Sequence, residues 1–202
     1  MVLSTALRLN VAAVMVLLTQ SHAAAGAVIT LDFEGFSDST SLTTQYPGVT
    51  FSNATVITAG ITLNEFEFPP HSGTNVVFDD GGPMSIRFAS PVLSFGGYFT
   101  YAEPLTLAGF DAASTGVASA ISLFSSNLAL SGDFGSSPNE FLSISFASGI
   151  SSVTITGDPA GGSFVLDDAT YPTADTPVPE PGTVSLLLIG TAGILAVRKR
   201  IL

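Results

Sequence analysis

The strongest constraint on this chain is a series of short segments in which apolar and polar residues alternate. Near its start, Ile29, Leu31 and Phe33 occupy every second position before Gly35. A period of two is the spacing of side chains on one face of a β-strand, and residues 28 to 171 show no helical period with capping residues. The pattern therefore predicts half-buried strands and an all-β fold.

Turn-forming residues separate these segments. The cluster Asp79-Asp80-Gly81-Gly82-Pro83 is one example, because Asp caps a turn, Gly adopts positive φ and Pro ends strand pairing. About ten short strands, spaced by roughly 8 to 12 residues, are typical of an antiparallel β-sandwich. The predicted strands cover 28–34, 49–57, 61–68, 74–78, 84–88, 92–101, 106–111, 119–124, 140–146, 151–156 and 163–171.

The N-terminus has the features of a secretory signal peptide over residues 1–27. Arg8 is the only charged residue before Asp32, and residues 11–18 form an apolar core that is too short for a membrane span. Small residues at 23–27 offer a cleavage site, so the mature chain is expected to begin between Gly26 and Val28. The alternative is a signal anchor that stays attached.

The C-terminal tail, residues 179–202, follows a linker at 173–178. It consists of Pro179-Glu180-Pro181, an apolar run with a predicted membrane helix at 183–197, and the basic cluster Arg198-Lys199-Arg200. The prolines keep the tripeptide extended, and the basic cluster favours the cytoplasmic side of a membrane. The apolar run from Gly182 to Val197 has 16 residues and as a helix reaches roughly 24 Å, short of the ~30 Å bilayer core, so we expect transient rather than permanent membrane retention.

This ending resembles the PEP-CTERM sorting signal of Gram-negative bacteria that produce exopolysaccharide. The resemblance implies that the secretion machinery exports the chain and holds it briefly in the inner membrane. It further implies that an exosortase recognises Pro179, Glu180 and Pro181, removes the tail, and releases the protein to the cell surface or extracellular matrix. The alternative is an ordinary tail anchor after a Pro-rich linker.

The charge and cysteine content exclude several classes of function. Residues 28–177 contain fifteen acidic side chains and one basic side chain, Arg87, and therefore carry a formal charge of −14. Such a surface cannot neutralise phosphates, which argues against nucleic acid as a partner, and it attracts divalent cations. The chain has no cysteine, so thiol catalysis and zinc–thiolate sites are excluded.

A second, looser resemblance covers most of residues 28–172. The segments 31–35, 46–51, 86–92 and 164–168 occur in an order similar to that of jelly-roll, galactose-binding-like domains, which are related in shape to carbohydrate-binding modules. The resemblance implies a jelly-roll β-sandwich in which the first and last strands pair. It also implies a structural Ca²⁺ near that junction, held by Asp32, Glu34 and either or both of Asp167 and Asp168.

The acidic residues also have simpler interpretations. Asp32 and Glu34 would share one strand face, where solvated carboxylates discourage edge-to-edge aggregation. Asp79 and Asp80 form a second candidate cation site, but a turn needs the same residues. Neither cluster has the spacing of an EF-hand loop.

No catalytic motif stands out. His71 is the only histidine of the predicted mature chain and is expected in a loop, and no serine lies in a Gly-x-Ser-x-Gly elbow. The chain has no tryptophan to stack on sugars, and Tyr98 and Tyr101 should point to opposite faces of one strand. We therefore predict a non-enzymatic surface or matrix protein associated with exopolysaccharide or biofilm. A calcium-dependent carbohydrate-binding module is the alternative, and an acid-pair glycoside hydrolase is a weaker one.

Overall fold

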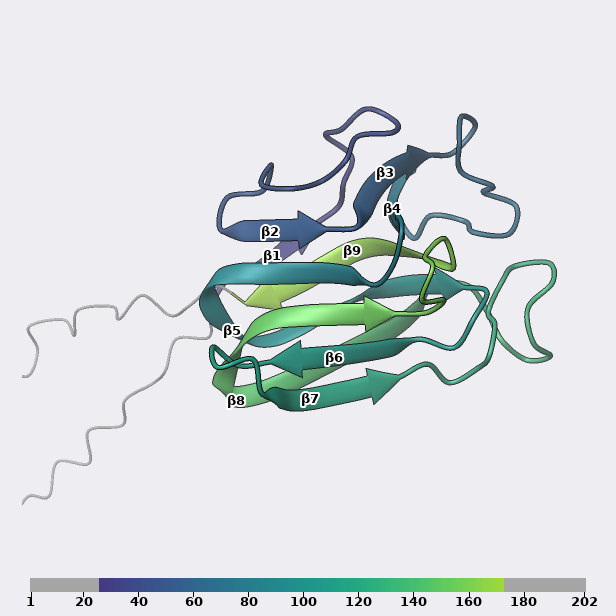
Figure 1. Ribbon diagram of the computed structural model, residues 1–202. Helices are drawn as coiled ribbons and strands as arrows, with labels where there is room; N and C mark the ends of the chain where they lie inside the picture. Colours follow the sequence, from purple (N-terminus) through teal and green to yellow (C-terminus); the bar gives the residue numbers. More distant parts are fainter. Residues whose placement is uncertain (1–25, 173–202) are drawn as a thin grey trace, which may run out of the picture.

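The computed structural model describes residues 26–172 (Figure 1). Four sequence predictions lie wholly or almost wholly outside this range: the signal peptide, the linker, the Pro-Glu-Pro motif, and the C-terminal helix with its basic cluster. Within residues 26–172, no helix is long and apolar enough to cross a membrane.

The described part of the chain contains nine β-strands and no α-helix, which confirms the all-β prediction. All pairings between the strands are antiparallel. The strands are β1 (Val28–Leu31), β2 (Val49–Ser52), β3 (Ala54–Thr58), β4 (Asn75–Asp79), β5 (Met84–Tyr101), β6 (Thr106–Phe110), β7 (Gly116–Ile121), β8 (Glu140–Thr156) and β9 (Phe164–Pro172).

Two long bent strands, β5 and β8, connect two layers of the sandwich (Figure 1). Their parts at 84–87 and 152–155 pair with each other and join β2, β6 and β7 in what we call the β6 layer. Their parts at 94–99 and 140–145 pair again and join β9, β4 and β3 in the β9 layer. Strand β1 pairs with the last part of β9, so the first and last strands do pair.

The bend between the layers lies at Pro91 and Gly149. The pairing of β5 with β8 shifts register on both sides of Val92. Gly149 has a φ of 95°, and a Cβ atom there would lie 2.7 Å from the Cβ atom of Pro91. Pro91 therefore marks a bend inside one strand, and the separate strands predicted on either side of it, at 84–88 and 92–101, are one element. The same holds for 140–146 and 151–156, which are parts of β8.

Three other predicted strands differ from the structure. The segment 49–57 is two strands, β2 and β3, which are separated at Asn53 with its φ of 54° and pair with β5 and β4, respectively. The first strand of the chain ends at Leu31 instead of Glu34, because Phe33 adopts a φ of 60° and buries its ring completely. The segment 61–68 is not a strand but a series of turns, in which the amides of Glu67 and Phe68 donate to the carbonyl of Asn64.

The main hydrophobic core lies between the two layers. The β6 layer contributes Ile86, Leu107 and Ile155, and the β9 layer contributes Phe99 and Leu166, all of them fully buried. Tyr101 is also buried there while Tyr98 is only half-buried, as expected for opposite faces of one strand. The outward face of the β9 layer carries a second, small cluster under the loop 59–68. The pocket described in the next subsection lies on this outward face.

Candidate functional site

A β-bulge turns both Asp167 and Asp168 toward the loop at 71–75. Gly96 pairs with Thr170 and Tyr98 pairs with Asp167, so β9 has one residue more than β5 over this stretch. Asp168, with a φ of 44°, is the residue in the left-handed conformation. Consecutive residues of a regular strand point to opposite faces, and the extra residue removes that restriction.

These two aspartates fix the loop through hydrogen bonds. The Oδ2 atom of the buried Asp167 accepts bonds from the amides of His71 and Ser72, at 2.8 and 2.9 Å. Oδ2 of Asp168 lies 2.6 Å from Nδ1 of His71, and its Oδ1 accepts a bond from the Ser72 hydroxyl. His71 is therefore in a loop, as predicted, but its ring is held in place.

Glu34 holds the other end of the same loop. Its Oε1 accepts bonds from the amides of Thr74 and Asn75, both at 2.8 Å. Gly73 permits this approach, since a Cβ atom there would lie 2.3 Å from the Glu34 carboxyl carbon. Asp32 is exposed and accepts a bond from the amide of Glu34. Because β1 ends at Leu31, the prediction that Asp32 and Glu34 share a strand face is wrong.

The structure brings Glu34, Asp167 and Asp168 to one loop, as acceptors for its amides and side chains. Within residues 26–172, no three acidic or histidine side chains gather as a set that could hold a metal ion. Calcium prefers six to eight oxygen ligands, and backbone carbonyls and waters can supply part of such a set. Calcium binding by Asp32, Glu34, Asp167 and Asp168 therefore stays a prediction, to be tested with a chelator.

The two residues of the other acidic pair have different surroundings. Asp79 is not part of the predicted turn: it is the last residue of β4, is fully buried, and accepts bonds from Ser163 and Phe164. Burial raises the pKa of Asp79. Asp80 is exposed and accepts a bond from the hydroxyl of Thr55 at 2.9 Å.

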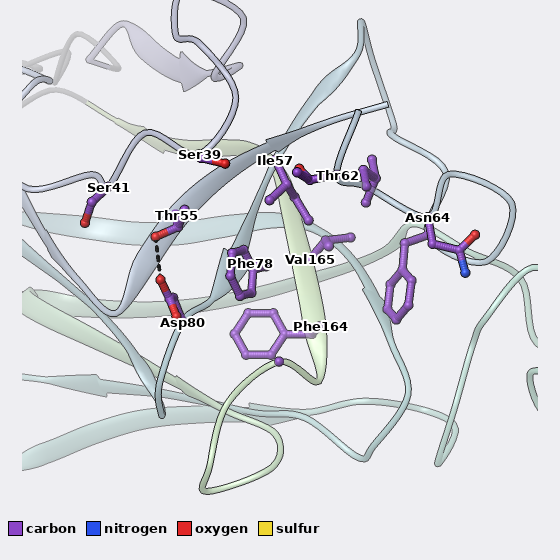
Figure 2. Close-up of a pocket in the computed structure, with 13 residues that line it drawn as sticks. Ser39, Ser41, Thr55, Ile57, Thr62, Asn64, Phe78, Asp80, Phe164 and Val165 are labelled. Atoms are coloured by element: carbon purple, nitrogen blue, oxygen red, sulfur yellow. Dashed lines mark hydrogen bonds between the residues drawn. The ribbon is translucent and has the colours of Figure 1, made fainter. Parts of the chain in front are cut away.

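Asp80 and Thr55 belong to a pocket of about 590 Å³ on the outward face of the β9 layer (Figure 2). Its floor follows from strand register: Thr55 of β3 pairs with Phe78 of β4, which pairs with Val165 of β9. Residues paired in this way lie side by side on one face of a sheet. Ile57, two residues after Thr55, extends the floor.

Two non-strand segments form the walls. Ser39 and Ser41 come from a segment that lies along the free edge of β3, where the amide of Ser39 donates to the carbonyl of Val56. Thr62 and Asn64 come from the loop 59–68 on another side. Figure 2 shows these side chains around the phenyl rings of the floor.

Asp38 ties the two walls together. Its Oδ1 accepts bonds from the amide of Thr58 and the hydroxyl of Thr62, and its Oδ2 accepts one from the hydroxyl of Ser39. The hydrogen bond from Thr62 is the main reason that the pKa of Asp38 lies below its ordinary value. The pocket is therefore a preformed cavity with linked walls.

The lining of the pocket combines hydroxyl, amide and carboxylate groups with apolar rings. Sequence reasoning missed it because its residues come from segments far apart in the chain. Its polar groups can donate and accept hydrogen bonds, and Phe68 and Phe78 offer apolar surfaces. Among the lining residues, Asp80 is the only charged one. Such a cavity suits a neutral ligand that carries many hydroxyl groups and has an apolar face.

Solved structures with a similar overall outline share little sequence with this chain. The K2 cleaved adhesin domain of Lys-gingipain is 14% identical, with a TM-score of 0.48, and the match covers 73% of this chain and 100% of that one. A DUF4465 family protein from Bacteroides caccae is 12% identical, with a TM-score of 0.49 and the same coverages. A family 11 carbohydrate-binding module of a cellulosomal cellulase of Clostridium thermocellum is 14% identical, with a TM-score of 0.34 and coverages of 75% and 97%.

All three TM-scores are below 0.5, and the fold is established by the strand pairings themselves. No curated protein matches the sequence.

The C-terminal tail matches a known family model: residues 177–200 match the model described as the PEP-CTERM protein-sorting motif. The resemblance of the tail is thereby confirmed, and the chain carries the sorting signal of an exported protein destined for the surface of a Gram-negative cell.

Proposed function

We propose that this protein is a non-enzymatic carbohydrate-binding protein of the cell surface or matrix, which an exosortase releases from its tail. The observation that carries the binding function is the pocket in Figure 2, with its linked walls, hydroxyl-rich rim and phenyl floor. A sugar ring has hydroxyl groups at its edge and C–H groups on its faces, and this lining offers partners for both. The sorting motif supports a location at which exopolysaccharide is the abundant ligand.

The charge of the domain narrows the class of polysaccharide. The one acidic lining residue, Asp80, and the strongly negative chain disfavour uronate-rich or sulfated polymers. We therefore propose a neutral exopolysaccharide as the ligand, one that contributes to a biofilm matrix. Glycoside hydrolysis would need two carboxyl groups across the bond, whereas the lining residues include only one, which supports a binding role.

The pocket is tested with variants that remove one polar group each. Asn64→Ala and Asp80→Ala should each weaken retention on neutral exopolysaccharide about tenfold, because a buried hydrogen bond to a ligand is worth on the order of 1.5 kcal/mol. Retention is measured in a pull-down of the purified protein at several polymer concentrations. Glu103→Gln, at an exposed residue outside the pocket, is the matched control and should bind normally.

Two further arms make the experiment decisive. An anionic polysaccharide should not be retained at physiological salt. A chelator should leave retention unchanged if the pocket alone binds, whereas loss of retention would favour the calcium-dependent mode at Asp32, Glu34, Asp167 and Asp168. If the wild-type protein is retained on no polysaccharide, with or without Ca²⁺, the proposed function is wrong.

A further inference from the structure

Three aromatic rings form a row on the outward face of the β9 layer, away from the pocket in Figure 2. The ring of His71 stacks on that of Tyr98, with centroids 3.4 Å apart and planes 10° apart. The ring of Tyr98 also packs against the ring of Phe141, with centroids 5.1 Å apart. These two residues are paired neighbours on β5 and β8. The three rings come from a loop and two adjacent strands.

Each ring is held in position by its surroundings. The ring of His71 is fixed by Asp168, whose Oδ2 lies 2.6 Å from Nδ1. The ring of Phe141 lies over Gly96, because a Cβ atom on Gly96 would be 2.7 Å from Cζ of Phe141. Phe141 nevertheless has 49% of its surface exposed. An isolated exposed Phe is ordinary, but a half-exposed ring packed in a row of rings is a preformed surface.

The last ring of the row, Phe141, lines a groove of about 320 Å³ along the same face. The alternation of β8 places Ser143 and Ser145 in line with Phe141, while Thr170 of β9 faces them across Gly96. Gly96 lacks a side chain at the point where the three strands meet, and the ring of Phe141 lies in the space that a side chain would take. The groove thus has an aromatic end and a hydroxyl-lined floor.

We propose that this groove, with the His71–Tyr98–Phe141 row, is a second binding site for the same class of ligand, a neutral polysaccharide strand. The inference rests on the proposed function. The two sites share no lining residue, and both occupy the outward face of the β9 layer. The half-exposed ring of Phe141 offers an apolar surface to the C–H groups of a sugar, and serine and threonine hydroxyls can bind its hydroxyl groups. A chain long enough to reach both sites would bind more tightly than a short one, by effective concentration.

The chain offers a spectroscopic readout for this site, because it has no tryptophan and four tyrosines. Tyr98 belongs to the aromatic row and the largely buried Tyr171 lines the groove, whereas Tyr101 is buried in the core and Tyr46 packs against Phe33 and Phe51. The experiment titrates the purified protein with neutral oligosaccharides of four to eight units, prepared by partial hydrolysis of the exopolysaccharide of the producing cell. Binding should change the tyrosine fluorescence, and Tyr98→Phe should reduce this change while binding persists by calorimetry, since Tyr171 still lines the groove.

Variants locate the site. Phe141→Ala should weaken binding of these oligosaccharides about tenfold, and Ser143→Phe, which fills the groove from an exposed strand position, should do the same. Phe134→Ala is the matched control, because Phe134 is fully exposed and lies outside both sites. It should bind like the wild type. Melting temperatures close to that of the wild type confirm that the variants are folded.

The outcomes separate this inference from the proposed function. If Phe141→Ala and Ser143→Phe bind normally while Asn64→Ala and Asp80→Ala do not, the second site is refuted and the pocket stands. If the groove variants lose affinity, the second site is supported. If the wild-type protein binds none of the oligosaccharides and no polymer, both proposals fail together.

Discussion

Replacing Asp79 by alanine should lower the free energy of unfolding by about 3–5 kcal/mol, a large part of the stability of a typical domain. The Asp79 carboxylate is fully buried at the end of β4. It accepts bonds from the amides of Ser163 and Phe164 and from the Ser163 hydroxyl, at 2.9, 3.0 and 3.0 Å. Alanine would leave all three donors buried without an acceptor, and β9 begins at these donors.

Asp79→Asn gives the contrast that makes this prediction specific. Both amides donate to the same oxygen, Oδ1, which asparagine keeps. Its amide group can then donate to the Ser163 hydroxyl, and no buried charge remains. We expect Asp79→Asn to change the stability by less than about 1 kcal/mol, while Asp80→Ala, which removes a single hydrogen bond from the Thr55 hydroxyl, serves as the neighbouring control. Urea unfolding measures all three, and equal losses for Asp79→Ala and Asp79→Asn would contradict the account.

The wild-type protein should lose stability through Asp167 as the pH rises from about 4 to 7. Burial, as the main cause, together with the charge of Asp168, raises the pKa of Asp167 to about 6, from 3.8 in an unfolded chain. The folded state therefore binds the proton more tightly than the unfolded state. Stability from this residue is present at low pH and is lost as the pH passes from the unfolded to the folded pKa. A pKa difference of about two corresponds to roughly 3 kcal/mol.

Asp167→Asn isolates this contribution. Asparagine has no charge to lose, so the difference in unfolding free energy between the wild type and Asp167→Asn should shift by roughly 2–3 kcal/mol in favour of the variant between pH 4 and pH 7. Glu103→Gln, at an exposed carboxylate, is the control for general charge effects. Parallel stability curves for the wild type and Asp167→Asn would show that Asp167 does not titrate in this range.

Much of the fold could be predicted from the sequence because strands leave a simple pattern. The alternation at 74–78, 106–111 and 163–171 corresponds to β4, β6 and β9 within a residue or two. The same pattern wrongly predicted a strand at 61–68. Leu63 is buried there because this series of turns places it over the small hydrophobic cluster on the outward face of the β9 layer. Alternation reports which residues are buried, and a turn can bury them as well as a strand.

The sites were harder to predict because they depend on long-range geometry. Nothing in the sequence marks Asp168 as a residue with positive φ, and this conformation is what directs two consecutive aspartates to one loop. The pocket brings Ser39, Asn64 and Asp80 together across strands whose register cannot be read from composition. The tail was predictable because its features are contiguous in the sequence.

We propose that the tail delivers this domain to the cell surface and is then removed. The intact mass of the protein extracted from the cell surface tests this directly. We predict a chain that begins between Gly26 and Val28 and ends near Pro179-Glu180-Pro181, so that the cluster Arg198-Lys199-Arg200 is absent. Recovery of surface protein that still ends at Leu202 would contradict it.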